Sequence, residues 1–146
     1  MRRASRAIIL RDGNLLVMHR NKFGKIYDTL PGGELKIGET PEAGVIREIK
    51  EETSLDIKHP RLMYLEHAGK MYGDQYVFLC DYDGGEPKIL PGAEEDLINK
   101  LGKNIHEPKW MPLTELPGSN FVSGGLKKEI LYALKNGWPE NPKEFT

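Results

Sequence analysis

The chain has 146 residues, of which 38% are hydrophobic and 29% are charged. These values are ordinary for a globular protein, and the length suits one compact domain with its own core. The formal net charge is −1, so no overall electrostatic field draws the molecule onto nucleic acid or a membrane surface. We therefore expect residues 1–146 to form a single domain, with neither nucleic acid nor a membrane as a partner.

The cysteine content of the chain indicates the redox compartment in which the protein works. Cys80 is the only cysteine, so an internal disulfide is impossible, and a reducing cytoplasm fits best. Its apolar surroundings predict a buried, unreactive thiol. The N-terminal apolar run is too short for a signal peptide, and no stretch is long enough to span a bilayer. We expect a cytoplasmic protein.

The first half of the chain predicts a hairpin and a helix. Two apolar runs flank Asp12-Gly13, a dipeptide suited to a tight turn, and predict strands at about 4–11 and 14–20. Residues 25–35 form a short extended run that ends where Pro31-Gly32-Gly33 breaks regular structure. A helix follows at about 40–53, where Thr40 is a good N-cap and Pro41 fits the first turn.

The second half predicts three strands and a closing helix. Strands are expected at 61–70, 75–85 and, as a last short strand with a turn, 109–117. An amphipathic helix at 124–137 ends at Gly137, with Pro139 beyond it. The region 86–106 has the weakest pattern and predicts a loop with a short helix. Helices among hairpin-connected strands indicate an α+β fold of layered sheet and helix.

Three glutamates of the first helix share one face. Glu48, Glu51 and Glu52 are spaced i, i+3, i+4 and therefore fall within a 100° wedge. Their mutual repulsion costs a few tenths of a kcal/mol per pair, so a compensating positive charge is expected. Magnesium prefers a few carboxylates together with phosphate oxygens. A second, apolar face should pack on the sheet and contains Val45, Ile46, Ile49 and the methyl group of Thr53.

Taken alone, such an acidic face is most often simply solvated, and three details favour a site. Gly44 lies on the same face, where a helical glycine costs about 1 kcal/mol relative to alanine but lets another group approach. Arg47 is placed i, i+4 from Glu51 and can hold that carboxylate. The glycines at 32–33 can bring backbone close to the same wedge.

These residues resemble the Nudix family. Its signature, the Nudix box, is matched by Gly33, by Glu39 six positions later, and then by Arg47-Glu48-Ile49-Lys50-Glu51-Glu52. Ser54 stands where the family pattern has a glycine. That position ends the helix, so serine should cost about 1 kcal/mol of stability and leave the metal ligands intact. The resemblance implies a Nudix-type α/β/α sandwich with a mixed sheet, a box helix and a C-terminal helix.

The resemblance also implies a chemistry. Nudix enzymes use Mg²⁺ or Mn²⁺ to hydrolyse nucleoside diphosphates linked to another group. By position, the catalytic residues would be Arg47, Glu48, Glu51 and Glu52, and the metal ligands Glu48, Glu51, Glu52 and the backbone of Gly32 or Gly33. Glu39 would support the site. We expect Glu48 to serve as the general base, with Glu107, Glu94 and Glu95 as alternatives.

Substrate contacts are less defined. Arg20, followed by Lys22 and Lys25, ends the second strand, where it could contact phosphate or simply be exposed. Tyr72 is a candidate for stacking on a base and Glu107 is a further candidate substrate contact, whereas Trp110 is expected in the core. Among Nudix enzymes, a tyrosine near position 72 is associated with dinucleoside polyphosphates. The proline associated with ADP-ribose and the motif associated with NADH are absent.

The histidines and the N-terminal arginines have no assigned role in the site. The four histidines lack metal-ligand spacing and are expected to be structural or exposed. Arg2, Arg3 and Arg6 form a basic cluster at an end expected to be loose and solvated. The substrate class therefore stays broad, from nucleoside triphosphates and dinucleoside polyphosphates to ADP-ribose and nucleotide sugars, and a homodimer is possible. The alternatives are a catalytically inactive Nudix-like nucleotide-binding module and a plain α+β interaction domain.

Overall fold

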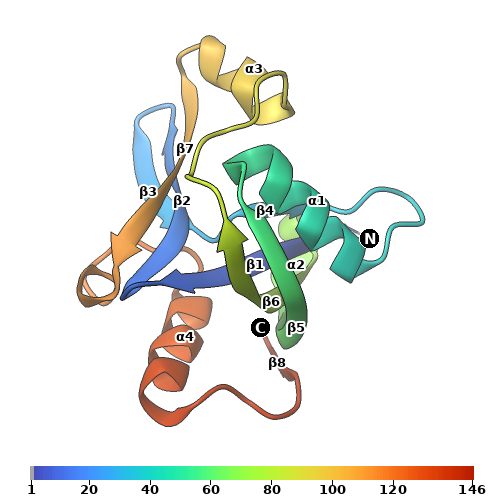
Figure 1. Cartoon of the computed structure of the whole chain (residues 1–146), viewed down its shortest axis with the longest axis vertical. Helices are drawn as coiled ribbons and strands as arrows, with labels where there is room; N and C mark the ends of the chain where they lie inside the picture. Colours follow the sequence, from blue (N-terminus) through green and yellow to red (C-terminus); the bar gives the residue numbers. More distant parts are fainter. Residues whose placement is uncertain (1) are drawn as a thin grey trace.

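The computed structural model describes residues 2–146 and shows a mixed β-sheet with helices on both faces (Figure 1). The strands are β1 (Arg3–Arg11), β2 (Asn14–Lys22), β3 (Lys25–Thr29), β4 (Gly32–Glu34), β5 (Asp56–His67), β6 (Asp74–Gly84), β7 (Asn104–Pro112) and β8 (Lys143–Phe145). The helices are α1 (Pro41–Thr53), α2 (Gly69–Tyr72), α3 (Glu94–Lys100) and α4 (Gly124–Asn136), with a 3₁₀ turn η1 (Leu113–Glu115). This is the α/β/α sandwich that the sequence predicts.

Alternation along β1 explains the two cores. Side chains of successive strand residues point to opposite faces, so Ala7 and Ile9 pack with Val45 and Ile49 of α1. Ile8 lies on the other face, in the cluster that includes the α4 side chains. Among residues 2–146, no helix is both long enough and apolar enough to cross a bilayer.

The sheet forks at the first hairpin. β1 and β2 pair only next to their turn, through Leu10 with Leu15 and Arg11 with Asn14. Beyond these pairs β1 continues between β4 and β6, whereas β2 continues between β3 and β7. Because β1 and β2 diverge beyond these two pairs, a space opens between them, and residues of α1 and α3 border it.

Several element boundaries differ from the sequence prediction. β5 begins at Asp56 instead of 61, because its exposed first half is irregular: His59 has φ +52° and the register shifts there. β7 begins at Asn104 and the turn η1 follows it, so the expected strand at 109–117 covers only its end. The run 25–35 holds two strands, and the three-residue β8 is too short to show a periodic pattern.

Helix α1 ends at the serine that replaces the family glycine. Ser54 adopts a left-handed conformation with φ 62° and ψ 6°, and its N–H donates to Lys50 O. The Ser54 hydroxyl donates a 2.6 Å hydrogen bond to Lys88 O, while Lys88 N–H in turn donates to Thr53 O. The hydroxyl bond therefore offsets part of the strain that a non-glycine residue has in this conformation.

We predict that Ser54→Gly changes the free energy of unfolding by less than about 1 kcal/mol, because relief of the strain and loss of the hydroxyl bond oppose each other. Ser54→Ala keeps the strain and loses the bond, so it should destabilise by about 1 kcal/mol. Urea unfolding of the three proteins measures both effects. Equal stability of the alanine and wild-type proteins would contradict a role for the hydroxyl.

Candidate catalytic cleft

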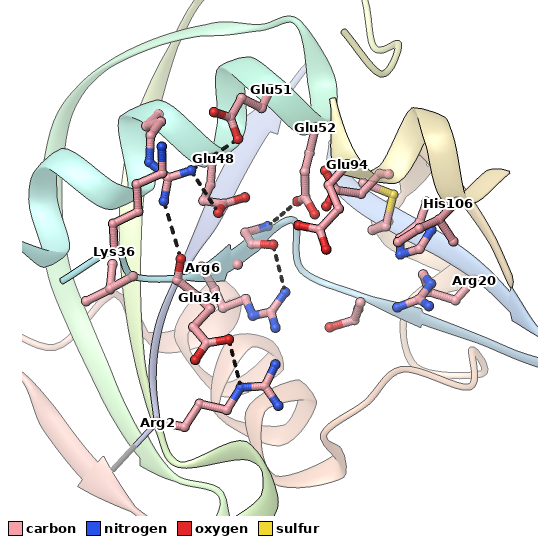
Figure 2. A pocket seen from close by; sticks show the side chains of 18 residues that line it. Arg2, Arg6, Arg20, Glu34, Lys36, Glu48, Glu51, Glu52, Glu94 and His106 are labelled. Atoms are coloured by element: carbon pink, nitrogen blue, oxygen red, sulfur yellow. Dashed lines mark hydrogen bonds and ion pairs between the residues drawn. The ribbon is translucent and has the colours of Figure 1, made fainter. Parts of the chain in front are cut away.

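The fork between β1 and β2 opens into a cleft of about 610 Å³. Its walls come from the two diverging strands, the loop around β4, and helices α1 and α3. The lining residues are Arg2, Arg6, Met18, Arg20, Thr29, Gly32, Gly33, Glu34, Leu35, Lys36, Arg47, Glu48, Glu51, Glu52, Glu94, Glu95, Ile98 and His106. Figure 2 shows the α1 glutamates on one side of this cleft and several arginines across from them.

Arg47 organises the acidic side of the cleft. Its Nε and Nη2 donate to the two carboxylate oxygens of Glu39, at 2.7 and 2.9 Å. Its Nη1 donates to Glu48 Oε1 at 3.0 Å and to Glu51 Oε2 at 3.1 Å. Such bidentate, charge-assisted bonds fix orientation as well as charge. Arg47 thus links Glu39 of the loop to two carboxylates of α1.

Glu52 faces the glycine loop. Its Oε2 accepts a 2.7 Å hydrogen bond from Gly32 N–H, which fixes the buried carboxylate beneath the loop. Gly32 O accepts from Arg6 Nη1 at 3.2 Å, so the carbonyl predicted as a metal ligand is hydrogen-bonded to an arginine here. A side chain at Gly32 would meet Ser5 O at 2.0 Å, and therefore only glycine fits.

Two further glycines permit close packing around the wedge. A Cβ at Gly33 would lie 2.6 Å from Glu48 Oε2, so the loop presses directly on this carboxylate. A Cβ at Gly44 would lie 2.2 Å from Leu35 Cδ2. A group does approach Gly44, as expected, but it is the Leu35 side chain. Within α1, Val45 and Ile49 are buried as predicted, whereas Ile46 is 45% exposed and the prediction for it was wrong.

Burial sets the protonation of these groups. Burial raises the pKa of Glu48 to about 7 and that of Glu52 to about 8, with the charge of Glu95 acting in the same direction. The hydrogen bond from Arg47 lowers the pKa of Glu39 to about 2. Glu39 is therefore fully ionised at neutral pH, while protons bind Glu48 and Glu52 more tightly than an ordinary carboxylate and an added positive charge would displace them.

The chemical types of the donors, though not their present spacing, suit a hard divalent cation. Three carboxylates offer only oxygen ligands, which Mg²⁺ and Mn²⁺ prefer, and Arg47 already places a positive charge between Glu48 and Glu51. Among residues 2–146, no three His, Cys, Asp or Glu side chains lie close enough together to form a preassembled metal site.

The other predicted contacts divide into two groups. Arg20, Glu94 and Glu95 line the cleft, the glutamates from α3. Glu107 is exposed on β7, and Tyr72 is 56% exposed on α2; neither lines the cleft. The fold therefore does not bring these two residues to the site. Trp110 packs against the α1-side core, as expected.

Arg2, Arg6 and His106 are among the cleft residues that the sequence did not predict for the site. Arg6 lies within β1 and is half-buried, and Arg2 immediately precedes this strand. The expected loose, solvated basic end is therefore wrong for these residues. Strand alternation gives the signal for Arg6, since it lies between the buried residues Ser5 and Ala7 and points to the opposite side. His106 is half-buried, and burial lowers its pKa to about 4, so it is neutral at physiological pH.

Comparison with known proteins assigns the family. The profile of the NUDIX domain matches residues 1–131. The NAD-capped RNA hydrolase NudC of Photorhabdus laumondii is 35% identical over 125 residues, which cover 86% of this chain and 45% of that protein. The chain belongs to the NUDIX family of hydrolases. It spans less than half the length of the NAD-capped RNA hydrolases that it matches.

Solved structures agree on the fold. The MutT NUDIX hydrolase from Burkholderia pseudomallei superposes with a TM-score of 0.68 at 26% identity, covering 88% of this chain and 95% of that one. An ADP-ribose pyrophosphatase from Streptococcus suis gives a TM-score of 0.69 at 18% identity, covering 99% and 98%. The second likeness concerns the fold alone.

We predict that Gly33→Ala weakens Mn²⁺ binding at least about tenfold, because the new methyl group displaces the Glu48 carboxylate. The global fold should persist, since Gly33 has no left-handed backbone and the displaced group is the end of a flexible side chain. EPR titration with Mn²⁺ measures the affinity. Gly118→Ala is the control, because its Cβ would meet nothing within 4 Å. Unchanged Mn²⁺ affinity in Gly33→Ala would refute the proposed contact.

The raised carboxyl pKa values also predict a pH effect on the metal-free protein. The folded-state pKa values of Glu48 and Glu52 exceed the ordinary 4.5, so the folded state holds more protons than the unfolded state. Stability should therefore fall as pH rises from 4.5 towards 8. Melting temperatures in EDTA across this range measure the slope.

The double variant Glu48→Gln/Glu52→Gln should flatten this slope, because it removes both titrating groups. Saturating Mg²⁺ should also flatten it, by favouring the ionised carboxylates. A wild-type slope that survives in the double variant would assign the pH effect to other groups.

Proposed function

We propose that residues 1–146 form one Nudix domain that uses Mg²⁺ or Mn²⁺ to hydrolyse a pyrophosphate bond in a nucleoside diphosphate linked to another moiety. The observation that carries this proposal is the Arg47 cluster. One guanidinium joins Glu39 of the neighbouring loop to Glu48 and Glu51, and the cleft that these two line also contains the buried Glu52. A solvated acidic helix face would need neither the bidentate Arg47–Glu39 pair nor the close approach of Gly33 to the Glu48 carboxylate.

Each residue of the site has a distinct role in this proposal. Bound to the α1 carboxylates, the cation would supply neutralisation of the anhydride and activation of water. Glu39 stays ionised and holds Arg47, and Arg47 orients Glu48 and Glu51. Gly32 N–H orients Glu52. Gly32 O or Gly33 O could add a ligand if the Arg6 contact yields.

The general base is proposed to be Glu48, which lines the cleft and is held by Arg47. Glu94 and Glu95 are the alternatives that the cleft supports, since α3 places both at its wall. Burial raises the pKa of Glu95. Glu107 lies outside the cleft and is a weaker candidate.

The substrate remains open within one chemical class. The relatives' names mention NAD-capped RNA and ADP-ribose, and both contain a pyrophosphate bond to a nucleoside. The test is therefore a panel with Mg²⁺: nucleoside triphosphates, dinucleoside polyphosphates, ADP-ribose, nucleotide sugars, NAD and NAD-capped RNA. Release of phosphate, pyrophosphate or nucleotide is measured. We propose a small-molecule nucleotide and a cytoplasmic setting, in which the buried Cys80 stays reduced.

We predict that Glu51→Gln and Glu52→Gln keep the fold but lose most Mg²⁺-dependent turnover of the best panel substrate. Each change removes charge from a proposed ligand and preserves its shape. Glu42→Gln is the matched control, because Glu42 is an exposed glutamate of the same helix. Initial rates and circular dichroism on the same samples provide the comparison. Wild-type turnover in both variants would remove these residues from the metal site.

The inactive-module alternative predicts a different pattern. A module that only senses a nucleotide would bind a panel compound with Mg²⁺ yet release no product from it. Binding without turnover across the whole panel would favour the module, while turnover of any member by wild-type protein would exclude it.

A further inference from the structure

One wall of the cleft is built from neighbouring positions of β2, β3 and β7. Arg20 lies opposite His106 in the register of β2 and β7, and Figure 2 shows these two side chains close together. Met18 lies opposite Thr29 in the register of β2 and β3. Residues two apart on a strand point to the same face, and so do the members of a cross-strand pair. All four side chains line the cleft, together with Ile98 of α3.

Asn99 of α3 holds the main chain of His106. Its Nδ2 donates a 2.8 Å hydrogen bond to His106 O, and its Oδ1 accepts a 2.7 Å hydrogen bond from His106 N–H. These two bonds determine the orientation of the Asn99 amide, because a main-chain N–H needs an acceptor and a main-chain carbonyl needs a donor. The atom of Asn99 that faces His106 N–H is therefore the oxygen, which carries no proton.

The orientation of Asn99 determines the tautomer of His106. His106 Nδ1 lies 3.3 Å from the same Asn99 Oδ1, in hydrogen-bonding geometry. Since this oxygen can only accept, Nδ1 must carry the proton. Burial and the positive charge of Arg20 lower the pKa of His106 to about 4, so the ring is neutral and holds one proton only. His106 Nε2 therefore has a lone pair and no hydrogen.

Nε2 is the atom of His106 that a ligand in the cleft can reach. It lies at the tip of a side chain that lines the cleft, whereas Nδ1 is next to the main chain and is turned towards α3. Within residues 2–146, Nε2 receives no hydrogen bond from another protein group. A neutral acceptor without a partner is matched by a ligand that brings an N–H or O–H donor.

Apolar side chains on the same wall narrow the class of donor. Met18 is 2% exposed and Ile98 is half-buried, and both line the cleft with His106. Ribose and phosphate are polar on every side, whereas a nucleobase has two apolar faces and a hydrogen-bonding edge. A site with apolar walls and a few placed polar groups suits such a flat ring. Proteins read nucleobases in this way, by contact with their faces and by hydrogen bonds to their edges.

We propose that His106 selects the nucleobase of the substrate, with Nε2 accepting a hydrogen bond from an amino group on the edge of the base. The inference rests on the proposed function and deepens it, because it concerns the nucleoside rather than the pyrophosphate bond. Adenine, cytosine and guanine carry such an amino group, whereas purine, uracil and hypoxanthine are the corresponding rings without it. A base without the amino group leaves the acceptor unpaired and binds less tightly.

A structural role for His106 is the competing explanation. The bond from Nδ1 to Asn99 joins β7 to α3, so replacement of the ring can loosen α3. A structural role weakens the binding of bases with and without the amino group equally, whereas the proposed contact changes the ratio of the two affinities. His106→Gln and His106→Phe separate these cases, because glutamine keeps an acceptor near the end of the side chain and phenylalanine keeps only a flat ring.

The tautomer is tested first, in the protein without ligand. The ¹⁵N chemical shifts of the His106 ring distinguish a protonated Nδ1 from a protonated Nε2. We expect the proton on Nδ1 at neutral pH, and a proton on Nε2 would overturn the inference.

The binding test uses α,β-methylene nucleoside diphosphates, which resist hydrolysis, titrated calorimetrically into the full chain with Mg²⁺. The adenosine, cytidine and guanosine compounds are compared with those of purine riboside, uridine and inosine. Wild-type protein should bind at least one amino compound about three- to tenfold more tightly than its partner, the range expected for one hydrogen bond. His106→Phe should abolish this preference, and His106→Gln should retain part of it. Methylenediphosphonate, which has no base, should bind wild type and both variants alike.

A wild-type preference that survives in His106→Phe, or no preference in the wild-type protein, overturns selection by His106. Neither readout depends on turnover, so the inference and the proposed function can fail separately. If nucleotides of the panel are hydrolysed with Mg²⁺ while His106→Phe keeps the wild-type preference, the hydrolase proposal stands and the inference fails. If no panel compound is hydrolysed but the preference for an amino group depends on His106, the inference stands and the hydrolase proposal fails.

Discussion

The contact on which the site depends is the Arg47 guanidinium among the carboxylates of Glu39, Glu48 and Glu51. Without it, glutamates at i, i+3 and i+4 would repel one another and turn to water. Glu39 is the residue that makes the arrangement stable, because it gives Arg47 a fully ionised partner on the loop. The loop and the helix are thereby locked together by charge before any cation is considered.

The fork in the sheet gives this charged cluster its setting. Because β1 and β2 pair at only two positions, a cleft forms inside the sheet layer itself rather than at its edge. Helix α1 borders one wall, and α3 borders the other. Glycines at the close contacts, Gly32 and Gly33 above all, let the loop lie flat against the carboxylates without intervening side chains.

Much of this arrangement could be predicted from local pattern. The i, i+4 spacing gave the Arg47–Glu51 pair, and the caps gave both long helices, because these signals act within a single element. Arg6 was missed because its role depends on β4 and β6, which lie far away in sequence. The prediction that Tyr72 contacts substrate did not place it in the cleft for the same reason, because the residue type alone does not say which side of the molecule the side chain faces.

The fork also divides the lining of the cleft into two walls with different side chains. The wall of β1, β4 and α1 carries the charged cluster, whereas the wall of β2, β3, β7 and α3 carries side chains such as Met18 and Ile98, which are free of it. The two walls meet at only two residue pairs, so substitutions at Met18 or Ile98 leave the contacts of the Arg47 cluster unchanged, whereas the charge of Glu95 on the same wall acts on Glu48 and Glu52. Substitutions at such uncharged positions can therefore change what the cleft binds while the α1 carboxylates stay the same.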